Sequence, residues 1–218
     1  MIIKAWMPRY NWGDQINREL AWLITGEWPE LVHANTFQAK PHYLCIGSIL
    51  TYCDPASIVW GSGFLSAEDK LTREPAKICA VRGPLSRAAL LKQRVYCPEV
   101  YGDPALLLPR FYNPQIRKRH NLGVVLHWGD VNNAKMFKHV ILPTSPPFKF
   151  IDEILACKAI LSSSLHGLIV AEAYGIPADQ LVLSEDHYQF KFDDYKESRK
   201  YLDLNKLMDV CPFKRAEK

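Results

Sequence analysis

Short β-rich runs alternate with longer segments of helical periodicity along most of the chain, and this alternation limits the fold more than any other feature. In residues 14–25, for example, Ile16, Leu20, Leu23 and Ile24 fall on one side of a helix. Strands that alternate with helices predict parallel sheets with crossover helices. We expect strands at 2–6, 43–47, 57–60, 77–81, 122–127, 140–142, 159–162 and 181–183, and further helices at 84–93, 148–157 and 165–174.

The alternation is interrupted between residues 109 and 121. This stretch holds two prolines and a basic cluster at 117–120, which is typical of a linker. We interpret its charges as a solvated connection; the alternative is a patch facing an anionic acceptor or a membrane surface. The linker predicts an α/β protein of two small Rossmann-like lobes, an N-terminal one at 1–114 and a minimal C-terminal one at 115–218.

The composition is that of a globular chain. Of 218 residues, 48% are hydrophobic and 23% charged, which excludes disorder, collagen and coiled coil. A net charge of +4 mildly favours anionic ligands, and without a dense basic face it does not predict nucleic-acid binding. Six cysteines form no CxxC pair and no zinc spacing, so we expect reduced, buried thiols and no metal.

The N-terminus runs directly into a strand pattern, without the apolar stretch and small-residue cleavage site of a signal peptide. No apolar run reaches the roughly 18 residues of a membrane span. We therefore expect a cytoplasmic chain, with peripheral association at the inner membrane surface if the basic linker binds there.

The first candidate motif precedes the helix at 14–25 and comprises Asn11, Trp12, Gly13 and Asp14. Gly13 permits close approach of backbone to a ligand, and Asp14 suits a helix cap. The free amides of a helix N-terminus also suit a phosphate or carboxylate, while Asn11 and Trp12 suit a sugar by hydrogen bonding and stacking. A structural cap and a ligand-binding turn both remain open interpretations.

Three further candidates lie in the N-terminal half, and the first two come directly after predicted strands. Gly61, Ser62 and Gly63 predict either a tight turn or backbone amides open to an anion. Arg82 lies beside a helix N-terminus and suits a bidentate clamp on phosphate or carboxylate; the alternative is a pair with a local carboxylate such as Asp103. Asp103 precedes a proline that fixes a turn, and is a candidate general base or partner of Arg82.

The most informative motif lies after the predicted strand at 159–162. Ser163 and Ser164 follow another serine and open a helix, which places hydroxyls and free amides together. His166 falls in the first turn, where the helix dipole disfavours an imidazolium unless an anion is bound. Such a histidine is well placed to meet a phosphate; the alternative is a histidine packed in the core. Gly167 lets the turn pack closely on ligand or sheet.

These motifs belong to an ordered set that covers most of residues 11–195. In chain order the set reads NWGDQIN, GSGF, AVRGPLSRAAL, YGDPALLLP, SSSLHGLIVAEAYGIP and FKFDDY. Together the stretches resemble the polysaccharide pyruvyltransferase family, and most closely its branch of exopolysaccharide ketal-forming enzymes of the succinoglycan type.

The resemblance implies a fold similar to that of B-type glycosyltransferases, with phosphoenolpyruvate as donor and a glycan, free or lipid-linked, as acceptor. It implies a pyruvate ketal as product and no cofactor. By similarity the VRGP arginine is Arg82 and the LHG histidine is His166, both at the donor site. Many members carry Arg directly before the Leu-His pair, where this chain has Ser164.

The chemistry that the resemblance implies suggests a role for each residue. His166 is the expected general acid or phosphate partner, and Asp14 or Asp103 is the expected base for the acceptor hydroxyl. Two alternatives remain. A small B-type glycosyltransferase that uses a nucleotide sugar would suit the two lobes and Glu172, and a non-catalytic glycan- or anion-binding protein would suit Ser164 and the short second lobe.

Overall fold

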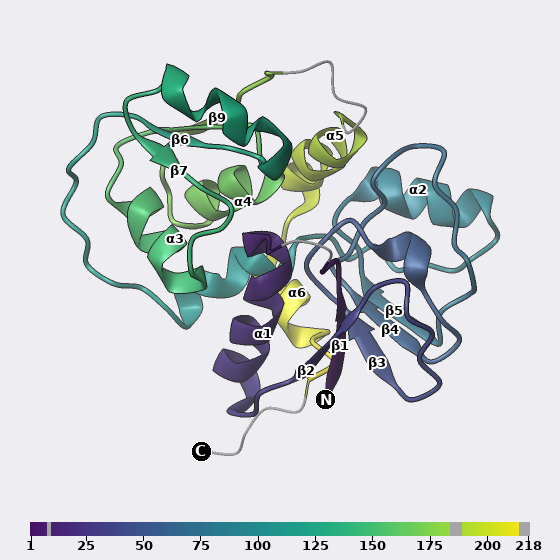
Figure 1. Ribbon diagram of the computed structural model, residues 1–218. Coiled ribbons are helices and arrows are strands. Elements are labelled where there is room, and N and C mark those ends of the chain that lie inside the picture. Colours follow the sequence, from purple (N-terminus) through teal and green to yellow (C-terminus); the bar gives the residue numbers. More distant parts are fainter. Residues whose placement is uncertain (8–9, 184–188, 214–218) are drawn as a thin grey trace. The chain divides into compact units, whose positions relative to one another are not determined.

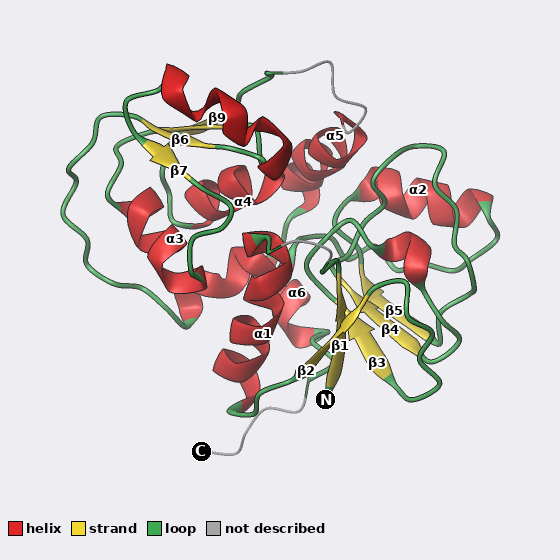
Figure 2. Cartoon of the chain, in the orientation of Figure 1, coloured by secondary structure: helices red, strands yellow, loops and turns green. Residues whose placement is uncertain are grey.

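The computed structural model describes residues 1–7, 10–183 and 189–213, and these form two compact units (Figure 1). The first unit takes the described residues of Met1–Arg9, Asn17–Pro104 and His187–Lys218, and the second takes those of Tyr10–Ile16 and Ala105–Asp186. Each unit contains its own parallel sheet with helices (Figure 2), so the predicted α/β class with two Rossmann-like lobes is confirmed. The units are built from interleaved segments, and the division at residue 114 stays a prediction.

The first unit has a five-stranded sheet in the order β2-β1-β3-β4-β5, in which every pairing is parallel. The order reverses between β1 and β3, and in open α/β sheets ligands bind beyond the strand carboxyl ends at such a switch point. The strands are β1 (Ile2–Ala5), β2 (Glu30–His33), β3 (His42–Leu44), β4 (Ser57–Trp60) and β5 (Lys77–Ala80).

Helices and an apolar core complete the first unit. α2 packs against α5, and buried side chains of β3, β4 and the loops form one cluster around Val59, Phe64 and Leu90. Near the C-terminus, the Trp60 indole donates to the Leu207 carbonyl at 2.9 Å, which ties the last helix to β4. The elements are α1 (Trp12–Thr25), which begins in the second unit, η1 (Leu50–Tyr52), α2 (Pro84–Lys92), α5 (Gln189–Ser198), η4 (Arg199–Tyr201) and α6 (Leu204–Asp209).

The second unit has a four-stranded parallel sheet in the order β7-β6-β8-β9, with its own switch point between β6 and β8. Gly167 lets α4 lie close to this sheet, because a Cβ there would come within 2.2 Å of Ser162 Oγ and 2.7 Å of a Val125 methyl. The elements are η2 (Pro104–Arg110), which begins at the last residue of the first unit, β6 (Gly123–Val125), η3 (Trp128–Met136), β7 (Val140–Ile141), α3 (Pro147–Leu155), β8 (Ile160–Ser162), α4 (Leu165–Ala173) and β9 (Ala178–Gln180).

The structure corrects some element predictions. The expected strand at 181–183 is wrong: β9 lies three residues earlier, where Ala178 to Gln180 pair with β8. The pairing with β8 determines this strand, since two of its three residues are polar. β2, α5 and α6 had no strong periodic signal and were not predicted.

The basic stretch at 117–120 is a connection with fixed contacts at its end. Arg119 and His120 donate their backbone N–H groups to the Ala156 carbonyl, at 2.7 and 3.1 Å, and Lys118 Nζ donates to the Cys157 carbonyl. All six cysteines are free thiols, five of them buried, as predicted. In the described part of the chain, no helix combines the length and apolar character needed to cross a bilayer.

Candidate functional site

Loops from two strands meet at the switch point of the second unit. Ser163 follows β8 and donates its N–H to the Val125 carbonyl of β6 at 3.0 Å. The Ser163 hydroxyl accepts the N–H of His127, which follows β6, at 2.9 Å. The carboxyl ends of β6 and β8 are therefore joined by hydrogen bonds where the strand order reverses, which is where α/β sheets present ligand-binding loops.

The serine run builds the start of α4. The buried Ser162 hydroxyl donates to the Ser164 carbonyl at 2.6 Å and accepts the Ser164 N–H at 3.1 Å, so it holds the turn. Ser164 occupies the N-cap position with extended backbone and makes no side-chain capping bond. The first turn of α4 thus follows a fixed turn, with the positive end of the helix dipole directed at the switch point.

His166 is the second residue of α4, and Gly13 lies directly against it. A Cβ built on Gly13 would come within 2.2 Å of His166 Nδ1 and 2.3 Å of its Cε1. The Trp12 and His166 ring centroids are 6.1 Å apart. Two motifs separated by about 150 residues in the sequence therefore meet in the second unit, and only glycine at position 13 lets them approach so closely.

The remaining residues of the first motif hold this segment in place. The helix begins at Trp12, so Asn11 rather than Asp14 holds the capping position, and its carbonyl accepts the N–H of Asp14 at 3.1 Å. Asn11 Nδ2 donates to the buried Asp14 carboxylate at 2.8 Å. Asp14 is thus within the first helical turn, one residue after Gly13.

Trp12 packs in the core of the second unit. It is 1% exposed, its indole N–H donates to the Pro147 carbonyl at 2.8 Å, and its ring stacks on Phe150 with centroids 4.6 Å apart. Its backbone N–H donates to the Pro143 carbonyl, in the loop after β7. Trp12 therefore anchors the start of α1, and its predicted stacking on a sugar stays a prediction.

In the first unit, Arg82 forms a buried ion pair with Asp194 of α5. Arg82 is 1% exposed and Asp194 is fully buried; Arg82 Nε and Nη2 each lie 3.1 Å from Asp194 Oδ2. Arg82 also donates to the Ser48 hydroxyl at 2.7 Å and to the Phe64 carbonyl at 2.5 Å. The carboxylate partner of Arg82 is thus Asp194, not the suggested Asp103.

Asp194 also occupies the N-terminus of α2. Its Oδ1 accepts the Ser86 N–H at 2.9 Å and its Oδ2 accepts the Ser86 hydroxyl at 2.6 Å. A carboxylate from α5 therefore stands where a helix N-terminus otherwise attracts an anion. The sequence contained Asp194 in the FKFDDY stretch, but nothing local signals a partner more than 100 residues away.

The loop from Gly61 to Gly63 is held by hydrogen bonds to β5 and to the loop after β3. The N–H groups of Gly61 and Gly63 donate to the carbonyls of Ala80 and Gly47, at 2.9 and 3.2 Å, and the Ser62 hydroxyl donates to the Gly47 carbonyl. Gly61 has φ +94° and a Cβ there would lie 2.2 Å from Pro104 Cδ, so glycine is required. The predicted contact of this loop with an anion stays a prediction.

Asp103 borders the Gly61 loop, because a Cβ on Gly61 would come within 2.8 Å of the Gly102 carbonyl oxygen and 2.2 Å of Pro104 Cδ, on either side of Asp103. Asp103 is buried in the first unit. Glu172 lies in the last turn of α4, six residues after His166, which corresponds to about 9 Å along the helix axis. The structure therefore brings Asn11, Gly13, Asp14, Ser163, Ser164 and His166 to one region of the second unit and places Glu172 at the other end of the helix.

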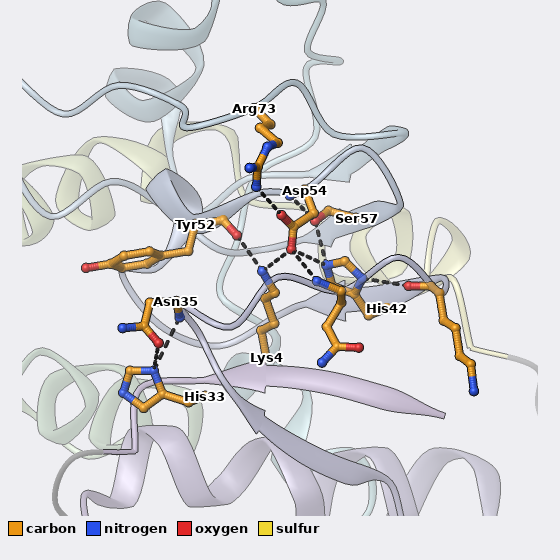
Figure 3. A network of polar contacts seen from close by, with 10 residues as sticks. Lys4, His33, Asn35, His42, Tyr52, Asp54, Ser57 and Arg73 are labelled. Carbon is orange, nitrogen blue, oxygen red and sulfur yellow. Dashed lines mark hydrogen bonds and ion pairs between the residues drawn. The ribbon is translucent and has the colours of Figure 1, made fainter.

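A second buried polar cluster, which the sequence analysis missed, surrounds Asp54 (Figure 3). Lys4 Nζ of β1 donates to Asp54 Oδ2 at 2.5 Å, and Arg73 Nη1 donates to Asp54 Oδ1 at 3.0 Å. The Ser57 hydroxyl lies 2.7 Å from His42 Nε2. Burial opposes ionisation of Asp54, but hydrogen bonds from Lys4, from a backbone N–H and from Arg73 outweigh it and lower its pKa. Burial lowers the pKa of His42. The sequence did not indicate that Lys4 is buried, because a charged residue in a strand pattern is expected on the exposed face.

A family model and a curated relative match the sequence of this chain. Residues 34–178 match the family model described as Polysaccharide pyruvyl transferase, a match that includes Arg82 and His166. The chain is 26% identical over 205 residues to the uncharacterized protein L143 of Acanthamoeba polyphaga mimivirus, covering 85% of this chain and 69% of that one. No solved structure matches. Gly13 and Asp194 lie outside the matched range.

Proposed function

The chain belongs to the polysaccharide pyruvyl transferase family, and from this premise we propose that it transfers the pyruvyl group of phosphoenolpyruvate to two hydroxyls of a cell-surface glycan, forming a pyruvate ketal. Transfer of pyruvyl to a polysaccharide is the activity of the family. The donor, the ketal product and the residue roles are our proposal. The observation that carries it is the contact of Gly13 with His166 at the switch point of the second unit.

The donor is expected at the start of α4. Phosphoenolpyruvate has a phosphate and a carboxylate, and both need hydrogen-bond donors or cations. The N-terminus of α4 supplies amides and a positive dipole end, next to the Ser163 and Ser164 backbone. A histidine at this place can hydrogen-bond a bound phosphate and donate a proton to the donor.

The proposed chemistry adds both acceptor hydroxyls to carbon 2 of the donor. Carbon 3 receives a proton, carbon 2 gains oxocarbenium character, and one hydroxyl attacks it. The bond from carbon 2 to the phosphate oxygen breaks, and the second hydroxyl closes the ketal. The two hydroxyl protons balance the one taken by carbon 3 and the one that leaves with phosphate. His166 is the proposed acid and Asp14, in the first turn of α1, the proposed base.

In this proposal Arg82 has a structural role. It is fully engaged with Asp194, Ser48 and Phe64 within the first unit. We assign it to the support of the loops after β3, β4 and β5, and its direct contact with the donor stays a prediction. Asp103, also in the first unit, stays the alternative base.

The test combines donor binding with phosphate release. A ligand at one hundred times its Kd adds ~2.7 kcal/mol of stability, so phosphoenolpyruvate should raise the Tm of the wild-type protein. Phosphate release is then followed with methyl glycosides of galactose, glucose and mannose as acceptors. His166→Gln should keep donor binding and lose about 10²- to 10⁴-fold in rate, while His139→Gln, in the same unit, serves as control.

Three outcomes contradict parts of this proposal. Wild-type turnover by His166→Gln would exclude its role as acid. Stabilisation by a uridine or guanosine diphosphate sugar, and not by phosphoenolpyruvate, would assign the chain to nucleotide-sugar chemistry. Stabilisation by a glycan with no turnover of any donor would favour a binding protein.

A further inference from the structure

Three aromatic rings meet at the carboxyl end of β1 in the first unit. Trp6 directly follows β1 and stacks on Tyr52, with centroids 5.6 Å apart and planes 26° apart. The His33 ring lies 5.0 Å from Trp6 at a tilted angle. Trp6 nevertheless keeps 40% of its surface exposed. Single exposed apolar side chains are ordinary, but a gathered group of rings indicates a binding surface.

The sheet explains why these rings meet. Ala5 of β1 pairs with His33 of β2, so Trp6 emerges directly beside the end of β2. Tyr52 belongs to η1, in the segment that follows β3. The group therefore lies where the strand order reverses between β1 and β3, the position at which open α/β sheets bind their ligands.

Polar contacts hold the group in place. Lys4 Nζ donates to the Tyr52 carbonyl at 2.8 Å and to the buried Asp54 carboxylate, which fixes η1 against β1 (Figure 3). His33 Nδ1 lies 2.5 Å from Asn35 Oδ1 and 3.3 Å from the Asn35 backbone nitrogen. Asn35 is exposed, so a planar amide borders the rings. Binding to a preformed surface avoids the cost of ordering loops and side chains.

We propose that Trp6, Tyr52, His33 and Asn35, here called the aromatic platform, bind one pyranose residue of the glycan acceptor. A pyranose has an apolar face of C–H groups and a rim of hydroxyls. The C–H face matches the negative face of an indole ring, and the rim matches the donors and acceptors of an amide and an imidazole. The inference rests on the proposed function in one respect, the glycan nature of the acceptor.

The chain offers a matched control at the other end of the same sheet. Trp22 and Trp28 stack with centroids 5.0 Å apart and planes 9° apart, and both are exposed. Trp28 precedes β2, at the amino end of the strands, and the Arg18 guanidinium lies over its ring at 4.7 Å. A cation thus already covers a Trp28 face, and the pair lies away from the switch point.

The experiment measures sugar binding at individual tryptophans. The protein is labelled with 5-fluorotryptophan, which gives one ¹⁹F signal for each of the six indoles. Signals are assigned with Trp6→Phe and Trp28→Phe, and methyl glycosides of galactose, glucose and mannose are titrated to millimolar concentration. We expect one glycoside to shift the Trp6 signal and leave Trp22 and Trp28 unmoved. Trp6→Ala or Asn35→Ala should weaken its Kd about tenfold, an effect of about 1.4 kcal/mol, and Trp28→Ala should not.

The outcomes separate this inference from the proposed function. If no glycoside shifts the Trp6 signal, or if Trp6→Ala binds the sugar as wild type does, the platform is refuted. Phosphoenolpyruvate stabilisation is measured on the same samples. Donor binding without any response of Trp6 would overturn the platform alone. A Trp6 response without donor binding would support the platform and contradict the proposed donor. Thermal unfolding of each variant confirms that it is folded.

Discussion

Removal of the charge at Asp194 is expected to destabilise the first unit severely. Asp194 is fully buried and accepts hydrogen bonds from Arg82 and from two groups of Ser86. Asp194→Asn keeps the side-chain shape but leaves the Arg82 guanidinium buried without a counter-charge. Removal of one partner of a buried ion pair costs about 3–5 kcal/mol. For a chain of this length, each kcal/mol lowers the Tm by roughly 2–4 °C.

The measurement is urea unfolding followed by circular dichroism, with Glu197→Gln as the control. Glu197 also belongs to α5 and pairs with Lys200 at 2.7 Å, but both side chains are exposed. Such surface pairs contribute about 0–1 kcal/mol. Replacement of both Arg82 and Asp194 by leucine should recover much of the loss, because no buried charge remains unpaired. A loss in Asp194→Asn no larger than in Glu197→Gln would refute this account of the ion pair.

Three further results are expected. Gly13→Ala should displace His166 and lower phosphate release from phosphoenolpyruvate. Gly129→Ala should leave it unchanged, because its Cβ would come no closer than 3.4 Å to the nearby His127 ring. Equal rates of the two variants would exclude a role for the contact of Gly13 with His166. Burial lowers the pKa of His139 below its usual 6.5, so the unfolded chain binds its proton more readily and the free energy of unfolding should fall as pH drops below 6.5. His139→Gln should flatten that dependence in urea titrations. Burial raises the pKa of Cys53 to about 12, so mass spectrometry should show its alkylation by iodoacetamide only after unfolding.

Elements with a strong local pattern were predictable from the sequence. β4 occupies the predicted residues 57–60. α4 begins at the predicted Leu165, where the Ser162 hydroxyl holds the backbone of Ser164 in a turn. The strands at the sheet edges were harder to predict. β2 is a short, half-exposed edge strand, and β9 carries the polar residues Asp179 and Gln180, so only the neighbouring strand identifies it.

In the candidate site, the sequence indicated the individual motifs but not the contacts between them. The sequence indicated His166 and Gly13 as members of separate motifs, and each motif could be located because it follows a strand and opens a helix. Their contact could not be predicted, since residue spacing says nothing about which loops share a sheet edge. The same holds for Arg82, whose partner Asp194 lies more than 100 residues away in the chain.

The exposure of Trp6 could not be predicted from the sequence either. The sequence assigns it to the first strand, as one more apolar residue in a β-rich run. The strand ends at Ala5, and the register with His33 turns the next residue into an exposed ring beside two others. Register is set by pairing between strands and is not visible in one strand alone.

The most direct test of the central claim follows the donor carbon itself. Phosphoenolpyruvate labelled with ¹³C at carbon 2 is incubated with the protein and the glycoside that binds best, and the products are observed by ¹³C and ³¹P NMR. We predict a ketal carbon signal that appears together with an equal amount of inorganic phosphate, and no ketal signal in the His166→Gln sample over the same time. Phosphate accompanied by free pyruvate, or a donor that stays intact while a nucleotide sugar is consumed, would contradict it.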